Sequence, residues 1–242
     1  MRVAAGVYVL PIPRGSREAE GFLNLTLVLD DENGNTLVDT GLPGQEEAIA
    51  SALADAGIGV RDLGRIIFTH QDLDHVGSGA ALVRQSGARV SAHTVEAPFI
   101  EGELKPLKPT PEMLEQRPQM REVLQRLEPV SVDELLEDGE RLDLAGGTRV
   151  IFTPGHTPGH ASLYLERSRV LVAGDALTAE EGRLNGPNPP VTLDTDEAAR
   201  SVRRLAELDV ETIVCYHGGV VSEDANGQLR RVVEEGSGNL DA

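Results

Sequence analysis

The sequence lacks tryptophan, and only 3% of its residues are aromatic, so a hydrophobic core must be aliphatic. Cys215 is the one cysteine in 242 residues, which excludes an intrachain disulfide and suits a reducing compartment. No apolar run approaches the roughly 20 residues that cross a bilayer. The run Val3–Leu10 follows a single Arg and ends at Pro11, unlike a signal peptide. We therefore expect a cytoplasmic protein that does not bind membranes.

Basic residues are also scarce, with 22 Lys and Arg against 40 Asp and Glu and a formal net charge of −18. Such a surface repels nucleic acid, because nucleic-acid binding depends on basic patches. Metal-binding carboxylates would inflate this count, since bound divalent cations cancel part of it. We expect a small-molecule substrate and no nucleic-acid partner; the sequence leaves the oligomeric state open, a homodimer included.

Strand-like and helix-like segments alternate in two similar halves of one domain, residues 1–242. This alternation predicts an α/β architecture of two packed sheets with helices outside. Predicted strands are 3–10, 23–30, 36–39, 65–69, 89–92, 149–152, 161–165, 170–173 and 212–215. Predicted helices are 45–56, 76–85, 196–208 and 228–235. Five prolines interrupt residues 96–128, which we expect to be a helical insertion, either a surface excursion or a substrate lid.

A run of potential metal ligands follows the apolar strand at 65–69. Within His70-Gln71-Asp72-Leu73-Asp74-His75, two imidazoles and two carboxylates lie close together in the chain. Carboxylates crowded together without a counter-cation would force one of them to take up a proton. A pair of divalent metal ions removes this problem.

Three more candidate ligands stand at predicted strand ends. They are His156, in Thr153-Pro154-Gly155-His156, then Asp175 after Gly174, and His217 before Gly218-Gly219. A single histidine at a strand end is usually structural, but the joint pattern of histidine and aspartate at several strand ends predicts metal binding. The neighbouring glycines allow close approach of backbone to the site.

Taken in order, these motifs resemble the metallo-β-lactamase superfamily of hydrolases. They are His-x-Asp-x-Asp-His, then Thr-Pro-Gly-His-Thr-Pro-Gly-His, Gly-Asp and a C-terminal His, and the resemblance extends from Val38 to His217. It implies a four-layer αββα sandwich with a metal site along one edge of the sheets. It also implies a hydrolase that cleaves an ester, lactone or thioester with a metal-bridging hydroxide.

The resemblance further assigns the ligands. Site one would use His70, Asp72 and His156, and site two Asp74, His75 and His217, with Asp175 bridging the two ions. Asp74 would also act in catalysis, by orienting the hydroxide or moving a proton.

Asp72 departs from the family pattern, which usually has histidine there. Because a carboxylate is a harder ligand than imidazole, it shifts preference toward Fe or Mn, although two Zn ions remain the favoured prediction. The same position is a carboxylate in flavodiiron proteins. A di-iron oxidoreductase, of flavodiiron or persulfide dioxygenase type, is therefore the alternative, although a redox protein would normally need an electron partner such as a flavin domain.

Specificity within the superfamily stays open. Lactonases with the same Thr-Pro-Gly-His repeat usually have Tyr three residues after the bridging Asp, where this chain has Thr178. The basic C-terminal cluster that glyoxalase II-type thioesterases use for glutathione is not apparent either. Of the remaining residues, His160 and His93 are predicted to be structural, and Asp39 either supports the ligands or caps a turn.

Overall fold

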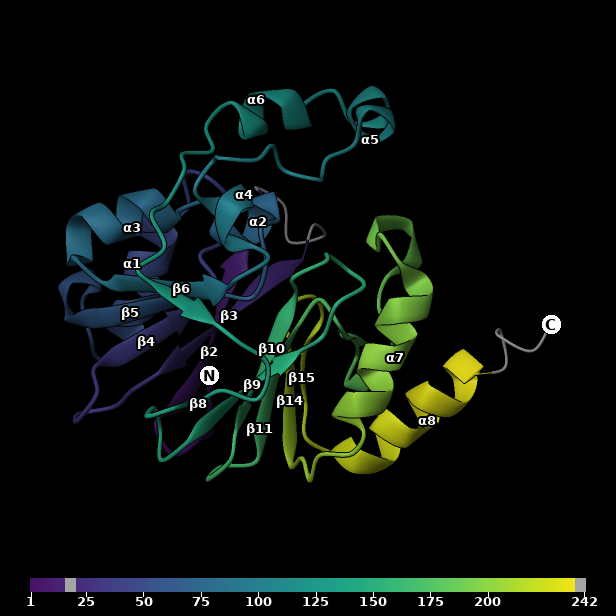
Figure 1. The fold of residues 1–242 in the computed structure, drawn as a ribbon. Coiled ribbons are helices and arrows are strands. Elements are labelled where there is room, and N and C mark those ends of the chain that lie inside the picture. The colour runs from purple at the N-terminus through teal and green to yellow at the C-terminus, as the bar shows by residue number, and fades with distance from the viewer. Residues whose placement is uncertain (16–20, 238–242) are drawn as a thin grey trace.

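The computed structural model describes residues 1–15 and 21–237, and in this part of the chain the strands form two sheets that pack face to face (Figure 1). The first sheet follows chain order: β1 (Arg2–Ala4), β2 (Val7–Pro13), β3 (Phe22–Val28), β4 (Asn35–Val38), β5 (Leu63–Phe68), β6 (Arg89–His93) and β7 (Glu134–Leu136). The second sheet has the order β15 (Gly219–Val221), β14 (Thr212–Cys215), β11 (Val170–Gly174), β10 (Ala161–Leu165), β9 (Thr148–Phe152) and β8 (Arg141–Leu142). A small hairpin joins β12 (Thr178–Glu180) to β13 (Arg183–Asn185).

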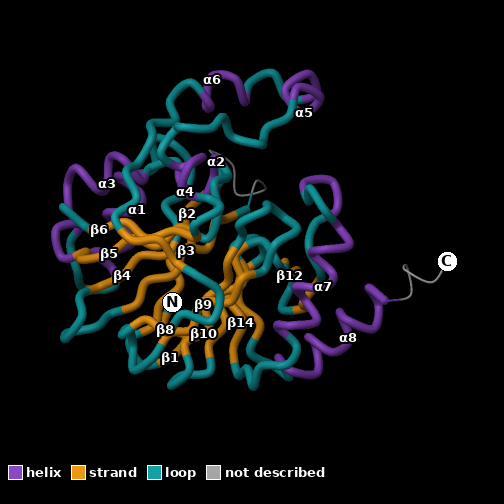
Figure 2. Tube along the Cα trace, viewed as in Figure 1, coloured by secondary structure: helices purple, strands orange, loops and turns teal. Residues whose placement is uncertain are grey.

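Helices cover the outer faces of both sheets (Figures 1 and 2). Helices α1 (Glu46–Asp55) and α3 (Gly79–Ser86) lie on the first sheet, and α7 (Thr195–Leu205) and α8 (Ala225–Ser237) on the second. The layers therefore run helix, sheet, sheet, helix. This arrangement confirms the α/β sandwich predicted from the alternating pattern.

The core between the two sheets is aliphatic, as the shortage of aromatic residues requires. Val9 and Ile67 of the first sheet pack in one buried cluster with Val150, Leu163 and Val172 of the second. Each sheet has one further cluster, which lies between the sheet and the helices that cover it. Full burial of each such side chain stabilises the fold by about 1.5–3 kcal/mol relative to exposure.

The parallel strands determine where the loops with polar residues meet. Strands β4, β5 and β6 run parallel in the first sheet, and β11 and β14 in the second, so the carboxyl ends within each group lie at one edge. Backbone hydrogen bonds join the two sheets there: Ala161 N donates to Thr69 O at 3.0 Å, and Asn24 N to Tyr216 O at 3.0 Å. This edge is the rigid frame of the candidate site.

One predicted helix is placed differently by the structure. The expected helix at 76–85 is two helices, α2 (Leu73–Val76) and α3, separated at Gly77 and Ser78. At Gly77 a Cβ atom would lie 2.4 Å from Cδ of Pro43, so the close approach of the Pro43 loop separates the two helices. The prediction was wrong at its start, and Asp74 and His75 are on a helix rather than in a loop.

The segment with many prolines begins with α4 (Ala97–Ile100), whose Ala97 and Ile100 are buried against the body. Beyond it, residues 101–129, which include α5 (Pro111–Gln116) and α6 (Met120–Leu124), cross over the same end of the molecule as α2 (Figure 1). We call residues 101–129 the covering segment. No helix in the described ranges has the length and apolar character that crossing a membrane requires.

Candidate metal centre

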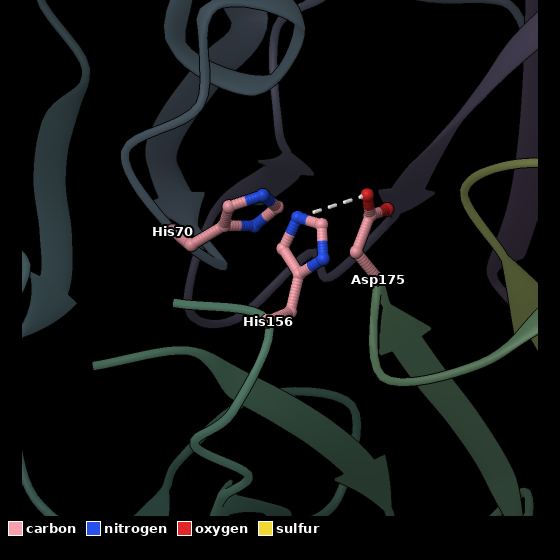
Figure 3. Close-up of side chains that lie close together, drawn as sticks. All are labelled: His70, His156 and Asp175. Atoms are coloured by element: carbon pink, nitrogen blue, oxygen red, sulfur yellow. Dashed lines mark ion pairs between the residues drawn. The ribbon is translucent and has the colours of Figure 1, made fainter. Parts of the chain in front are cut away.

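Two groups of ligand-type side chains meet at the edge where the two sheets are joined. His70, His156 and Asp175 form the first group (Figure 3), and their nitrogen and oxygen atoms lie within 4.8 Å of one another. The second group is Asp74, His75 and His217, with the same spacing. Six of the seven predicted ligands therefore fall into clusters that could each hold a metal ion.

Each of these side chains comes from a different strand end or from the short helix beside it. His70 follows β5, and Asp74 and His75 lie on α2, so one short stretch of chain, residues 70–75, contributes to both clusters. Residues 156, 175 and 217 follow β9, β11 and β14. Residues distant in sequence thus converge because their strands end at one edge.

Asp175 lies between the two clusters. Its Oδ1 atom is 3.4 Å from Nε2 of His75, and its Oδ2 atom is 3.3 Å from Nε2 of His156. Oδ2 is also 3.4 Å from Nε2 of His217. One carboxylate therefore faces imidazoles of both clusters, which is the geometry of a bridging ligand.

Asp72, the seventh predicted ligand, lies beside the first cluster but has a different principal partner. Its Oδ2 atom is 3.4 Å from Nε2 of His70 and 3.0 Å from Nε2 of His156. A third contact is shorter, because the ammonium of Lys108 lies 2.6 Å from the same oxygen. The lysine belongs to the covering segment, and nothing in its sequence context had identified it.

Hydrogen bonds behind the clusters fix two of the imidazoles. Nδ1 of His75 is 2.9 Å from Oδ2 of Asp39, and a carboxylate only accepts, so that nitrogen carries the proton. The hydroxyl of Thr69 donates to Asp39 Oδ2 at 2.8 Å and therefore accepts from Nδ1 of His70 at 3.0 Å. In its neutral form each ring consequently presents an unprotonated Nε2 to the centre, as metal ligation requires. Of the two roles predicted for Asp39, the structure favours support of the ligands.

The pKa values of the buried groups follow their surroundings. Burial would lower the pKa of His75, but Asp39 and Asp175 outweigh it and hold that pKa well above the usual range. Burial would raise the pKa of Asp175, but the three imidazoles around it keep the pKa far below normal. The pKa of His70 is lowered, first by burial and then by its neighbour His75. The carboxylate of Asp175 thus stays ionised in a crowded, buried site.

The donor atoms fit divalent metal ions. Nε2 of His70, Nε2 of His75 and Oδ1 of Asp175 are buried and find no hydrogen-bond partner among the residues that the structure describes. An unpaired buried polar atom costs about 1–3 kcal/mol, and such atoms facing one another from several strands would be a large defect. Bound cations would satisfy all of them with imidazole and carboxylate ligands of the kind that zinc takes.

Glu96 holds the two ligand loops together, although no motif in the sequence identifies it. The fully buried carboxylate accepts from Gln71 N at 2.8 Å and from Gly159 N at 2.7 Å. Burial raises its pKa, in spite of these hydrogen bonds. Tyr216 supports α2 directly. Its hydroxyl donates to the carbonyl of Asp74, and its ring packs against that of His75 with centroids 3.8 Å apart.

The structure places His160 behind the centre rather than in it. Its Nε2 accepts from the backbone N–H of Asp175 at 2.9 Å, and its Nδ1 lies 2.8 Å from the hydroxyl of Thr153. With both nitrogens used, His160 positions Asp175 and is not free to bind an ion. His93 stacks on Phe152 with ring centroids 4.4 Å apart and lies outside both clusters. These contacts agree with the structural roles predicted for both histidines.

A cavity of about 420 Å³ opens over the centre, between the clusters and the covering segment. Asp74 and His217 are the more accessible ligands, with side chains 20% and 25% exposed, whereas the other imidazoles of the centre are at most 1% exposed. The covering segment contributes two methionines and two cationic side chains to the lining. The lining includes Arg14, Leu73, Asp74, Lys108, Met113, Arg117, Met120, Thr178, Val191 and His217.

Comparison with known proteins bears on the chemistry. Residues 20–217 match the family model of the metallo-beta-lactamase superfamily. The probable metallo-hydrolase YflN of Bacillus subtilis (strain 168) is 32% identical over 206 residues, which cover 75% of this chain and 74% of YflN. A hydroxyacylglutathione hydrolase of Pseudomonas paraeruginosa is 34% identical over 185 residues, 72% of this chain but only 57% of that protein.

Solved structures show the same fold. A metallo-beta-lactamase family protein of Thermus thermophilus superposes with a TM-score of 0.78 and 28% identity, over 99% of this chain and 82% of that one. A metallo-beta-lactamase of Cronobacter sakazakii, 23% identical, superposes with a TM-score of 0.70 over the whole of this chain and 92% of that one. By fold, by motif order and by the match over residues 20–217, this chain belongs to the metallo-beta-lactamase superfamily.

Proposed function

We propose that the protein is a dinuclear metal-dependent hydrolase that cleaves an ester, lactone or thioester bond of a small molecule. The observation that supports this proposal best is the position of Asp175, whose one carboxylate faces imidazoles of both clusters, His75 at 3.4 Å from Oδ1 and His156 at 3.3 Å from Oδ2. Two divalent ions, with zinc the favoured pair, would supply a water activated near neutral pH and a Lewis acid for the carbonyl.

The chain's own residues would prepare this centre. Asp39 and Thr69 keep the protons of His75 and His70 on Nδ1, so that Nε2 of each ring points inward without rearrangement. His160 fixes the backbone of Asp175, and Glu96 ties the loop at Gln71 to the loop at Gly159. Such preorganisation saves the cost of arranging the ligands during reaction.

Asp74 is placed to move a proton. Its Oδ2 atom lies 3.4 Å from Nε2 of His217 and 4.0 Å from the guanidinium of Arg14, and the carboxylate reaches the cavity. A carboxylate in this position can accept a proton from the attacking water and return it to the leaving group. Asp74 is therefore the proposed catalytic residue as well as a proposed ligand.

The cavity suits a small acyl compound. Its volume of about 420 Å³ lies within the usual range for small-molecule sites. Met113 and Met120 offer flexible apolar surface for an acyl chain, and Arg14 and Arg117 offer positive charge at the rim. The named relatives that act on a hydroxyacylglutathione make thioesters a natural part of the substrate panel.

The test is metal analysis combined with hydrolysis assays. Protein reconstituted with zinc, manganese or iron is assayed against aryl esters, lactones and thioesters, with and without a chelator. We expect about two ions per chain, hydrolysis that chelation abolishes, and at least a 10³-fold loss of kcat/KM in His75→Ala. His93→Gln, outside both clusters, is the matched control and should retain activity.

The redox alternative makes a different prediction. About two iron ions per chain, no hydrolysis of any ester, lactone or thioester, and oxygen consumption with a reductant would refute the hydrolase proposal. Asp72 is the reason for testing this alternative, because a carboxylate ligand favours harder ions such as iron or manganese.

A further inference from the structure

Lys108 places a positive charge inside the first cluster. The chain contains only two lysines, Lys105 and Lys108, and both lie in the covering segment. Lys105 is exposed, whereas the side chain of Lys108 is only 6% exposed. A lysine is almost never buried unless its charge is paired, so its partners decide what it does.

The ammonium of Lys108 has three close partners for its three protons, and all three accept when His156 carries its ring proton on Nδ1. Nζ lies 2.6 Å from Oδ2 of Asp72, 2.8 Å from Nε2 of His156 and 2.8 Å from the carbonyl of Val191. Two of these atoms belong to predicted ligands of site one. The segment is held in place by a second contact, in which Leu107 N donates to Oε1 of Gln71 at 3.0 Å.

These hydrogen bonds and an ion at site one exclude each other. An imidazole Nε2 has a single lone pair, so His156 can accept from Lys108 or bind a metal, but not both. Asp72 has spare lone pairs and could keep its ion pair, but the ammonium would then face a divalent cation at close range. The second cluster has no comparable cation in direct contact among the described residues, since its nearest, Arg14, lies 4.0 Å from Asp74.

We propose that Lys108 is a tethered cation that competes with metal at site one, so that site two fills first and the second ion must displace the lysine. The inference rests on the proposed metal centre. It makes the second binding step, and the anchoring of the covering segment, depend on one side chain. It also gives Asp72 a role that histidine could not fill, because a carboxylate pairs its negative charge with the ammonium and a neutral imidazole has no charge to pair.

The first experiment measures binding. Zinc is titrated into the chelator-treated full chain by calorimetry and by competition with a chromophoric chelator, for the native protein, Lys108→Met and the matched control Lys105→Met. We expect two unequal steps in the native protein and in the control. In Lys108→Met we expect the weaker step to tighten at least 10-fold and the tighter step to stay unchanged.

The second experiment needs no variant. An amine-reactive label followed by peptide mass spectrometry reports on the two lysines separately, with exposed Lys105 as the internal reference. We expect Lys108 to react at least 10-fold more slowly than Lys105 without metal and with one equivalent of zinc, and to become reactive with the second equivalent.

The outcomes separate the two proposals. Two zinc ions bound with equal affinities by all three proteins, together with labelling of Lys108 that ignores the second equivalent, would overturn the competition while leaving the metal centre intact. Absence of zinc binding in all three proteins would overturn the metal centre and, with it, the inference.

Discussion

The imidazole of His75 is held by the carboxylate of Asp39, with 2.9 Å between Nδ1 and Oδ2. Both residues are buried, and Asp39 also accepts from the backbone N–H of Thr69 at 2.9 Å through its other oxygen. One carboxylate therefore sets the proton position of one ligand directly and, through the Thr69 hydroxyl, of a second ligand, His70. The two clusters share this support.

Replacing Asp39 should weaken metal binding without removing a ligand. In Asp39→Asn the amide nitrogen can donate but not accept, so either His75 or Thr69 loses its acceptor. We expect zinc affinity to fall about 10–100-fold, the usual effect of removing such a supporting group. Competition with a chromophoric chelator measures it, with the exposed Asp209→Asn as control. Equal affinities in the two variants would show that Asp39 does not support the ligands.

A side chain in place of the glycine before Asp175 should destabilise the fold. Gly174 has φ of +55°, and a Cβ there would lie 2.5 Å from Nε2 of His160, the atom that accepts from Asp175 N. Gly87 has φ of +71° with no atom within 4 Å of its Cβ position, so Gly87→Ala measures backbone strain alone. We expect Gly174→Ala to lower the free energy of unfolding by about 2 kcal/mol more than Gly87→Ala, which is the added cost of overpacking. Denaturant unfolding of both variants tests this, and similar losses would contradict it.

Much of the site could be predicted from the sequence because ligands of this family stand at strand ends. The strands leading to His70, His156, Asp175 and His217 are short apolar runs, and their pattern located each loop. Parallel neighbours within each sheet end at the same edge, so convergence followed from topology. The fold was accessible for the same reason: alternating helices and strands leave few layer arrangements.

What the sequence could not reveal depends on long-range contacts. Glu96 acts by joining loops and reaches Gly159 across 63 residues, and Lys108 reaches His156 across 48 residues. Neither residue lies in a motif, and a buried charge has no local signature until its partner is known. The break between α2 and α3 has the same origin, because the Pro43 loop packs against Gly77.

Acid should destabilise the metal-free protein partly through His160. Burial, followed by the nearby His156, lowers the pKa of His160 to about 3, against 6.5 for an unperturbed histidine. The unfolded chain therefore binds a proton there below pH 6.5 and the folded chain does not. The contribution of His160 to the free energy of unfolding is fully present above that pH. It is lost as the pH falls toward 3, by up to about 1.4 kcal/mol per pH unit.

The measurement is denaturant unfolding with chelator present, between pH 7 and pH 5, for the native protein and His160→Gln. Glutamine can still accept from Asp175 N but does not titrate. We expect a steeper loss of stability with falling pH in the native protein, after the shared contributions of the other groups cancel. Parallel pH profiles would show that His160 takes up a proton in the folded state as readily as in the unfolded one.

Asp72→His should change both the metal preference and the state of Lys108. The variant replaces a carboxylate 2.6 Å from Nζ of Lys108 with an imidazole, which removes the ion pair that holds the lysine in the first cluster. It also replaces a hard ligand with a softer one, so we expect the preference to move from manganese and iron toward zinc. Elemental analysis after equilibration with equal concentrations of the three ions measures the preference. The amine label, applied to the metal-free proteins, measures the exposure of Lys108. Asp62→His, on the surface, is the control. If Asp72→His binds the same ions as the native protein and leaves Lys108 unreactive, then Asp72 neither selects the metal nor holds the lysine.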